Sequence, residues 1–192
     1  MEQLLHYIDQ KISLSKEAKE LVKSISVLKK IKKGDILIRE NQFIDKTYFV
    51  VDGCLRSYVF DSNGKEHTLQ FALQDQWISD YIAIFNNEKS TQVVECIANS
   101  TVIEVSISEG IDNIFLRFPE IETLHRKNLQ RHIVSLQKRI LNQLQLSSLE
   151  RYHLLQKQNP AIEKYALNYH IASYLGITQQ SLSRIRAEIV KN

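Results

Sequence analysis

Glycine and proline are scarce in this chain of 192 residues, which has five glycines and two prolines. The glycines are scattered, so the sequence has neither the G-x-x-x-x-G-K-[S/T] loop that holds nucleotide phosphates nor the G-x-G-x-x-G turn of dinucleotide-binding domains. The H-E-x-x-H motif of zinc proteases and the G-x-S-x-G motif of serine hydrolases are also absent. Carboxylate pairs such as Asp75 and Asp80 do not indicate acid–base catalysis on their own. We therefore expect that this protein is not an enzyme.

Cysteines and long apolar runs are few as well. Cys54 and Cys96 are the only cysteines, and each lies in an apolar run without C-x-x-C spacing, which predicts buried, reduced thiols. His125 and His132 lie seven residues apart on a predicted helix, where we expect solvated side chains and no metal site. No stretch approaches the ~18 apolar residues of a membrane-spanning helix, and the N-terminal residues lack the layout of a signal peptide. We expect a cytoplasmic protein with no membrane partner.

The charges are unevenly distributed along the chain. Residues 1–116 contain 13 Lys and Arg against 17 Asp and Glu, a net charge of −4, whereas residues 117–192 contain 12 against 5, a net charge of +7. A basic segment is typical of a module that binds nucleic-acid phosphates. Double-stranded DNA is thus a candidate partner of the C-terminal part.

Short apolar runs dominate the first part of the chain. The first ~28 residues predict a leading helix with Ser15 as a candidate N-cap, because the apolar side chains recur at spacings of three and four. The following runs are β-branched and aromatic and are separated by turn residues, which predicts an antiparallel β-barrel or sandwich. Asn63 and Gly64 predict a type I′ hairpin turn. The predicted strands are residues 36–38, 48–51, 55–60, 68–72, 93–98 and 102–105.

A long helix is predicted over residues 117–146, since neither glycine nor proline interrupts the chain between Pro119 and Pro160. Its apolar residues recur at intervals of 4, 3 and 4, as in the seam of a dimeric coiled coil. An amphipathic helix that covers its own β-domain would show a similar pattern over so short a span. The predicted seam consists of Leu129, Ile133, Leu136 and Ile140.

The segment from residue 147 to 192 ends in the pattern of a helix-turn-helix. Asn168 is placed to cap a short helix that Gly176 would end in a left-handed conformation, and Thr178 is placed to cap a second helix from Gln179. The small Ala172 lies where two crossing helices come closest. The predicted inner face consists of Ile171, Leu175, Leu182, Ile185 and Ile189.

The outer face of the second helix is polar, and glutamine and arginine side chains can bond adenine and guanine edges in the major groove. Gln179, Gln180, Ser183, Arg184 and Arg186 form this predicted DNA-reading face, and Thr178 and Ser181 can bond phosphates.

Taken together, the sequence resembles the Crp/Fnr superfamily of bacterial transcription regulators over nearly its whole length. The resemblance lies in residues 33–35, 40–41, 48–53 and 61–66, in the long helix, and in residues 170–178 and 181–186. It implies an α+β fold: an N-terminal antiparallel β-roll with flanking helices (1–116), a long dimerisation helix (117–146) and a helix-turn-helix domain (147–192). It also implies a homodimer that binds DNA as a transcription regulator, with RNA polymerase as a further partner.

Two departures from this family qualify that resemblance. Members that bind cyclic nucleotides use a Gly-Glu pair followed by Arg-Ser or Arg-Thr, whereas the corresponding positions here lack the arginine. We therefore assign no cofactor. We expect that any small-molecule effector is not a cyclic nucleotide. The chain also stops just after the second helix, so the β-hairpin wing of the family is expected to be reduced or absent. The candidate effector pocket consists of Ser79, Asp80, Lys89, Ser90 and Thr91.

A second function fits the same residues. Without a wing, the chain could be a ligand-sensing or protein-interaction module that has no sequence-specific DNA binding.

Overall fold

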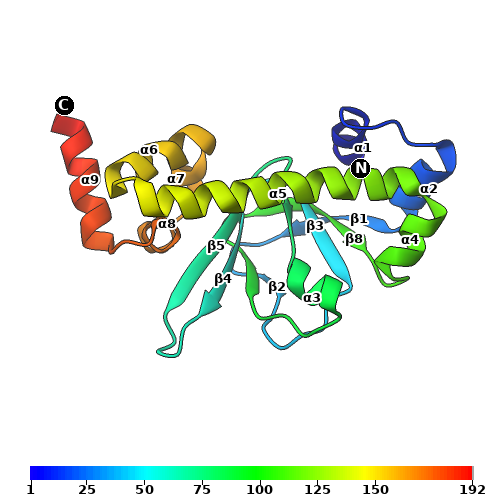
Figure 1. The fold of residues 1–192 in the computed structure, drawn as a ribbon, viewed down its shortest axis with the longest axis horizontal. Helices are drawn as coiled ribbons and strands as arrows, with labels where there is room; N and C mark the ends of the chain where they lie inside the picture. Colours follow the sequence, from blue (N-terminus) through cyan, green and yellow to red (C-terminus); the bar gives the residue numbers. More distant parts are fainter. Residues whose placement is uncertain (192) are drawn as a thin grey trace.

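The computed structural model describes residues 1–191 and has the predicted α+β architecture (Figure 1). Two four-stranded antiparallel sheets, ordered β1-β8-β3-β6 and β2-β7-β4-β5, form the β-roll. Its strands are β1 (Ser26–Ile31), β2 (Ile36–Ile38), β3 (Lys46–Asp52), β4 (Leu55–Phe60), β5 (Glu66–Ala72), β6 (Trp77–Ile78), β7 (Val93–Cys96) and β8 (Ser100–Ser106). The helices are α1 (Glu2–Asp9), α2 (Lys16–Ser24), α3 (Tyr81–Asn86), α4 (Ile111–Arg117), α5 (Pro119–Gln145), α6 (Ser148–Gln158), α7 (Ile162–Tyr165), α8 (Asn168–Leu175) and α9 (Gln179–Lys191).

The core of the β-roll lies between the two sheets. Val50, Leu55 and Val94 are fully buried there, because alternate side chains of each strand point inward and these are the apolar ones. Cys54 and Cys96 are buried, unpaired thiols, as predicted. Burial raises the pKa of Cys54 to about 12, which keeps it protonated.

The structure of the N-terminal segment agrees in part with the prediction from the sequence. The Ser15 side chain caps α2 by accepting a hydrogen bond from the Ala18 amide, as predicted. The prediction of helix through residue 25 and beyond is too long, because β1 starts at Ser26 and pairs with β8. Long-range pairing therefore determines the fold of this segment more than local periodicity does.

The hairpin between β4 and β5 does not have the predicted type I′ turn. Gly64 has a φ of 76°, but Asn63 does not have a positive φ. The Gly64 amide donates to the Asp61 carbonyl at 2.9 Å, and the Asp61 amide donates to the Lys65 carbonyl at 3.0 Å. This pattern is that of a three-residue loop with a type I turn followed by a left-handed glycine. The Asp61 carboxylate stabilises it by accepting bonds from the amides of Asn63 and Lys65.

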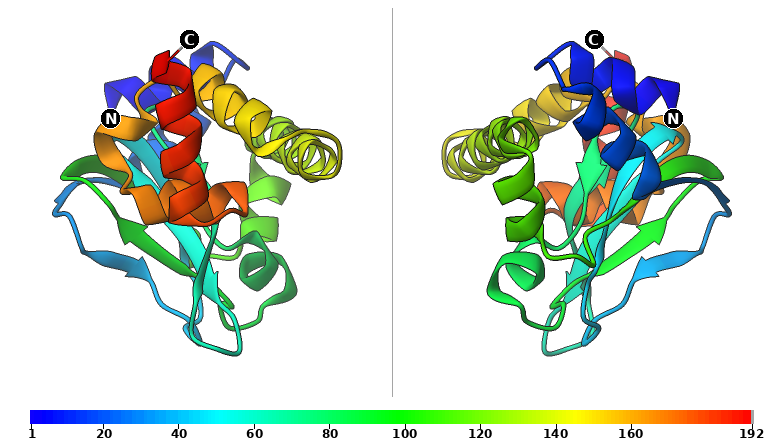
Figure 2. Two further views of the ribbon diagram at one scale, coloured as in Figure 1. Left: turned by 90° about the vertical axis from the view of Figure 1, so that its left-hand side faces the viewer. Right: turned by 90° about the vertical axis from the view of Figure 1, so that its right-hand side faces the viewer.

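Helix α5 runs along one side of the roll, and in Figure 2 it is seen nearly end-on beside the sheets. Helices α6 to α9 gather at its C-terminal end (Figure 1). Helix α8 rests on strand β5, where the Ser173 hydroxyl accepts from the Thr68 amide at 2.8 Å and donates to the Glu66 carbonyl at 3.0 Å. The C-terminal helices thus dock on the β-roll of the same chain. None of the helices within residues 1–191 is both long and apolar enough to traverse a bilayer.

Candidate nucleic-acid interface and effector site

Helices α8 and α9 pack as the sequence pattern predicts. Ile171, Leu175 and Leu182 are buried in the core shared by the C-terminal helices, and Ala172 is 2% exposed where α8 meets its neighbours. Gly176 ends α8 with a φ of 68°, a left-handed conformation that other residues adopt only at a cost. The pair is therefore a helix-turn-helix in geometry as well as in sequence.

The start of α8 differs from the prediction. Asn168 is the first residue of the helix, and Leu167 occupies the N-cap position. The Leu167 amide donates a hydrogen bond to the ring Nδ1 of His170 at 3.3 Å. The Asn168 side-chain oxygen accepts instead from the Arg186 guanidinium at 2.6 Å. This difference matters for the predicted reading face, to which Arg186 was assigned.

Five of the seven predicted DNA-binding residues lie exposed at the start of α9. The Thr178 hydroxyl caps the helix by accepting from the Ser181 amide at 3.1 Å, and the two hydroxyl groups lie 3.0 Å apart. Arg184 makes no ion pair or hydrogen bond with any other residue among the 191 described. The exposed residues are Thr178, Gln179, Gln180, Ser183 and Arg184, and Ser181 is half-buried beside them.

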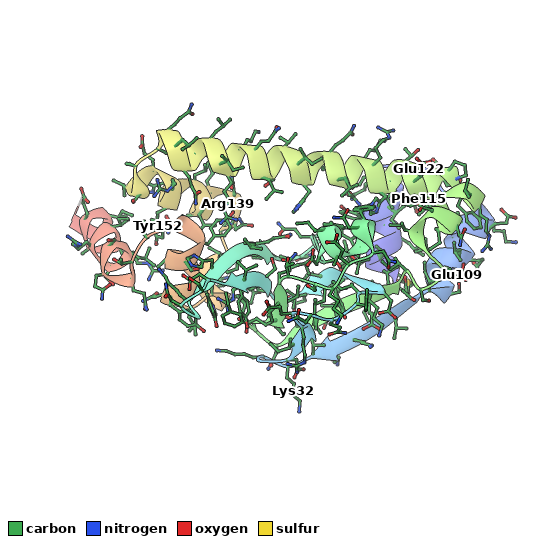
Figure 3. The ribbon with its side chains drawn as sticks, turned by 60° about the horizontal axis from the view of Figure 1, so that its bottom comes forward. Lys32, Glu109, Phe115, Glu122, Arg139 and Tyr152 are labelled. Carbon is green, nitrogen blue, oxygen red and sulfur yellow. The ribbon has the colours of Figure 1, made fainter. Side chains whose placement is uncertain are left out.

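The structure does not bring Arg186 together with these residues. Its guanidinium donates to the Tyr152 hydroxyl at 3.0 Å and to the Glu163 carboxylate at 3.2 Å, in addition to Asn168. Figure 3 labels Tyr152 among the C-terminal helices. Helical periodicity places Arg186 on the outer face, but its partners are distant in sequence and gave no local signal. Arg186 ties α9 to α6 and α7.

Three of the five predicted effector residues, Asp80, Ser90 and Thr91, form a hydrogen-bonded cluster. Asp80 is fully buried and caps α3 through the Ala83 amide, while its second oxygen accepts from the Ser90 hydroxyl at 2.8 Å and the Thr91 amide at 3.2 Å. These bonds satisfy both carboxylate oxygens without a ligand. The remaining two members lie apart from this network: Ser79 donates to the Lys46 carbonyl, and Lys89 is exposed.

The predicted dimer seam lies on the outside of α5. Ile133 is 53% exposed and Ile140 is 59% exposed, with Leu136 at 41% and Leu129 half-buried. Leu124 is the only side chain of this 27-residue helix that is buried. Ile133 and Ile140 are therefore open to solvent, whereas Leu129 and Leu136 also line hollows between α5 and the rest of the chain.

His125 and His132 are not solvated as the sequence pattern predicts. Both rings lie against Tyr81, with ring centroids 6.2 and 5.6 Å away, and burial lowers the pKa of both histidines. Among residues 1–191, no three side chains of the metal-ligating types come together.

Arg56 is a buried arginine that the sequence did not indicate as a site residue. Arg56 on β4 is 1% exposed, and its guanidinium is held between the carboxylates of Glu66 and Glu95 at 2.6 Å each. His170 of α8 lies beside this group, with Nε2 at 3.7 Å from the Glu95 carboxylate. Burial, followed by the charges of Arg56 and Lys33, lowers the pKa of His170 to about 3. The only sequence signal was an arginine within an apolar run.

A groove of about 970 Å³ lies between α5 and the rest of the chain. It is lined by the inner face of α5, the end of α1, β5, β6 and parts of α6 and α8. None of the five predicted effector residues lines it.

Both a family model and solved structures are similar to parts or most of this chain. Residues 28–112 match the family model of the cyclic nucleotide-binding domain. A comparison with curated proteins by sequence gives no match.

Among solved structures, a Crp/Fnr family protein from Eubacterium rectale is similar over 93% of this chain and 85% of its own, with 18% identity and a TM-score of 0.73. FixK2 from Bradyrhizobium japonicum is similar over 87% of this chain and 85% of its own, with 16% identity and a TM-score of 0.71. The c-di-GMP responsive global regulator CLP from Xanthomonas campestris is similar over 92% of both chains, with 11% identity and a TM-score of 0.68. Residues 28–112 thus resemble a cyclic nucleotide-binding domain, and most of the chain has the fold seen in solved structures of Crp/Fnr family proteins.

Proposed function

We propose that this protein is a dimeric, DNA-binding transcription regulator. The observation that carries the proposal is the start of α9, where polar side chains able to bond base edges stand exposed on a well-packed helix-turn-helix. Arg184 supports it most, because a guanidinium without a partner in its own chain is available to a guanine or a phosphate.

The proposed dimer is formed by α5. Only one side chain of this 27-residue helix is buried in its own chain, and its apolar stripe of Leu129, Ile133, Leu136 and Ile140 fits a second copy of the same helix. Two recognition helices held in this way would reach successive major grooves about 34 Å apart.

The test is enrichment of bound duplexes from a randomised pool, followed by sequencing, with the full chain and no added ligand. A palindromic motif is expected, because a two-fold symmetric dimer reads two equal half-sites. If duplexes of unrelated sequence are bound equally, or none is bound, the proposal fails. A ligand-sensing or protein-interaction module would then be the better description.

A further inference from the structure

The groove under α5 has an unusual charge. Six cationic side chains line it, and Asp75 is its only carboxylate. The cations are Lys11, Lys127, Arg131, Lys138, Arg139 and Arg151. None of the six forms an ion pair with a carboxylate within residues 1–191, although eight ion pairs of Lys or Arg with a carboxylate occur elsewhere.

The hydrogen bonds of these cations go to uncharged groups. Lys127 donates to the Lys11 carbonyl at 2.9 Å, and Arg151 donates to the Leu146 carbonyl at 2.6 Å. Arg139 donates to three backbone carbonyls of β5 and α8, and Figure 3 labels it on the side of α5 that faces the strands. Burial, followed by the charge of Arg131, lowers the pKa of Lys11 to about 8. The positive charge of the groove is therefore uncompensated.

The sequence pattern of α5 places its cations on the side of the helix that lines the groove. Arg131 and Lys138 line the groove, and each lies two positions before an exposed apolar residue of the outer stripe, Ile133 and Ile140. Two positions correspond to about 200° around a helix, so the two sets point in opposite directions. A helix that closed on its own domain would turn its apolar face inward. Here the apolar face is left for a second copy, and the groove stays open to a polar occupant after dimerisation.

Five of the residues that line the groove are aromatic: Tyr7, Phe71, Trp77, Tyr81 and Tyr174. Trp77 lines the groove, and its Nε1 is buried without a hydrogen-bond partner among the described residues. Tyr7 and Tyr174 line it as well, each with a cation over the ring, at 2.9 Å for Lys11 and 4.3 Å for Arg139. Such walls bind planar rings by stacking.

We propose that this groove binds a linear nucleoside polyphosphate as an effector. Its volume suits a ligand of this size. A phosphate monoester carries a charge of about −1.5 to −2, so a polyphosphate chain matches a cluster of six cations far better than the single charge of a cyclic phosphate does. The site is distinct from the Ser79 to Thr91 cluster, whose carboxylate is already satisfied. The inference adds an effector class to the proposed regulator, but binding can be measured without DNA, so the two proposals can fail separately.

The test uses the only tryptophan of the chain, Trp77, as the reporter. The full-length protein is titrated with ATP, GTP and cyclic AMP, with excitation beyond the absorption of the nucleotides, and calorimetry repeats each titration. We expect saturation with the triphosphates at lower concentration than with cyclic AMP. The double variant Arg131→Ala, Lys138→Ala is expected to weaken triphosphate binding at least tenfold, because both side chains are exposed and their removal leaves the core intact.

A matched control removes two exposed cations outside the groove, Lys29→Ala and Arg117→Ala, which pair with Glu104 and Glu109. Its affinity should equal that of the original chain. Absence of saturation at millimolar triphosphate, tighter binding of cyclic AMP, or equal weakening in the control variant would overturn the inference.

Discussion

Arg184 and Arg186 lie two positions apart on α9, and their surroundings give them different roles. Arg186 is bonded to three residues of its own domain, whereas Arg184 has no partner among the described residues. A bonded guanidinium contributes to stability, and an unbonded one is available for recognition.

We therefore expect Arg184→Ala to weaken binding to the selected duplex by ~1 to 3 kcal/mol while the fold and the dimer are kept. Fluorescence anisotropy with the selected and a scrambled duplex measures the effect. Arg117→Ala, on the distant helix α4, is the control and should change neither affinity. If Arg184→Ala weakens both duplexes equally, Arg184 contacts phosphate and does not read a base.

Gly53 is required by the close approach of β8. It has a φ of 95°, and a Cβ atom there would lie 2.2 Å from the Ser100 Oγ and 2.8 Å from the Ser100 Cα. The Ser100 hydroxyl cannot move without loss, since it accepts from the Cys54 amide and donates to the Ala98 carbonyl.

Gly53→Ala is thus expected to lower the free energy of unfolding by about 2 to 4 kcal/mol, from backbone strain together with overpacking. Urea denaturation measures it. Gly64→Ala is the matched control, because Gly64 also has a positive φ but meets no atom within 4 Å. The control should lose about 1 kcal/mol. Equal losses in the two variants would show that contact with Ser100 is unimportant.

At the scale of elements, α5 has two faces with separate uses. Ile133 and Ile140 on the outer side are apolar and exposed, whereas Arg131 and Lys138 on the opposite side line the groove. A substitution can therefore test one face without disturbing the other.

Ile140→Arg is expected to produce monomers, with dimerisation weakened at least tenfold, because it places a charge within the proposed apolar helix contact. Light scattering coupled to size exclusion measures the mass. Ser135→Arg adds the same charge to the groove face and should stay dimeric. A dimeric Ile140→Arg variant would mean that α5 is not the interface.

The elements that could be predicted from sequence are those with local signals. The helix-turn-helix depends on a threonine cap, a left-handed glycine and apolar spacing, all within residues 167–189, and each was correct except the Asn168 cap. Most strands were visible as β-branched runs between turns. Strand β1 was not, because its place depends on pairing with β8, some 75 residues away. The charge of the groove could not be predicted either, since its six cations come from α1, α5 and α6 and meet only in three dimensions.

For the whole molecule, the docking of α8 on the β-roll links the two ends of the chain. His170 lies at this junction, 3% exposed, beside the Arg56 guanidinium and the Glu95 carboxylate. Its folded-state pKa of about 3 is below the ordinary value of about 6.5, so the unfolded chain takes up a proton more readily between these values.

Stability is therefore expected to be full above pH 6.5 and to fall as the pH is lowered towards 3. This residue contributes a loss of about 1 to 2 kcal/mol at pH 5. Urea denaturation at pH 7.5 and pH 5 measures the loss, and His170→Gln should reduce the difference between the two pH values by that amount. An unchanged difference in the variant would assign the acid sensitivity to His125, His132 or the carboxylates.

Strand β5 is the last strand of its sheet, and its outer backbone groups bond to Ser173 and Arg139 rather than to another strand. An uncovered edge strand is a template on which other chains can pair and aggregate. The C-terminal helices therefore protect the β-roll from self-association as well as carrying the proposed recognition helix α9. Any rearrangement that separated α8 from β5 during DNA binding would expose this edge. Because an exposed edge promotes aggregation, we expect the C-terminal helices to stay in contact with β5.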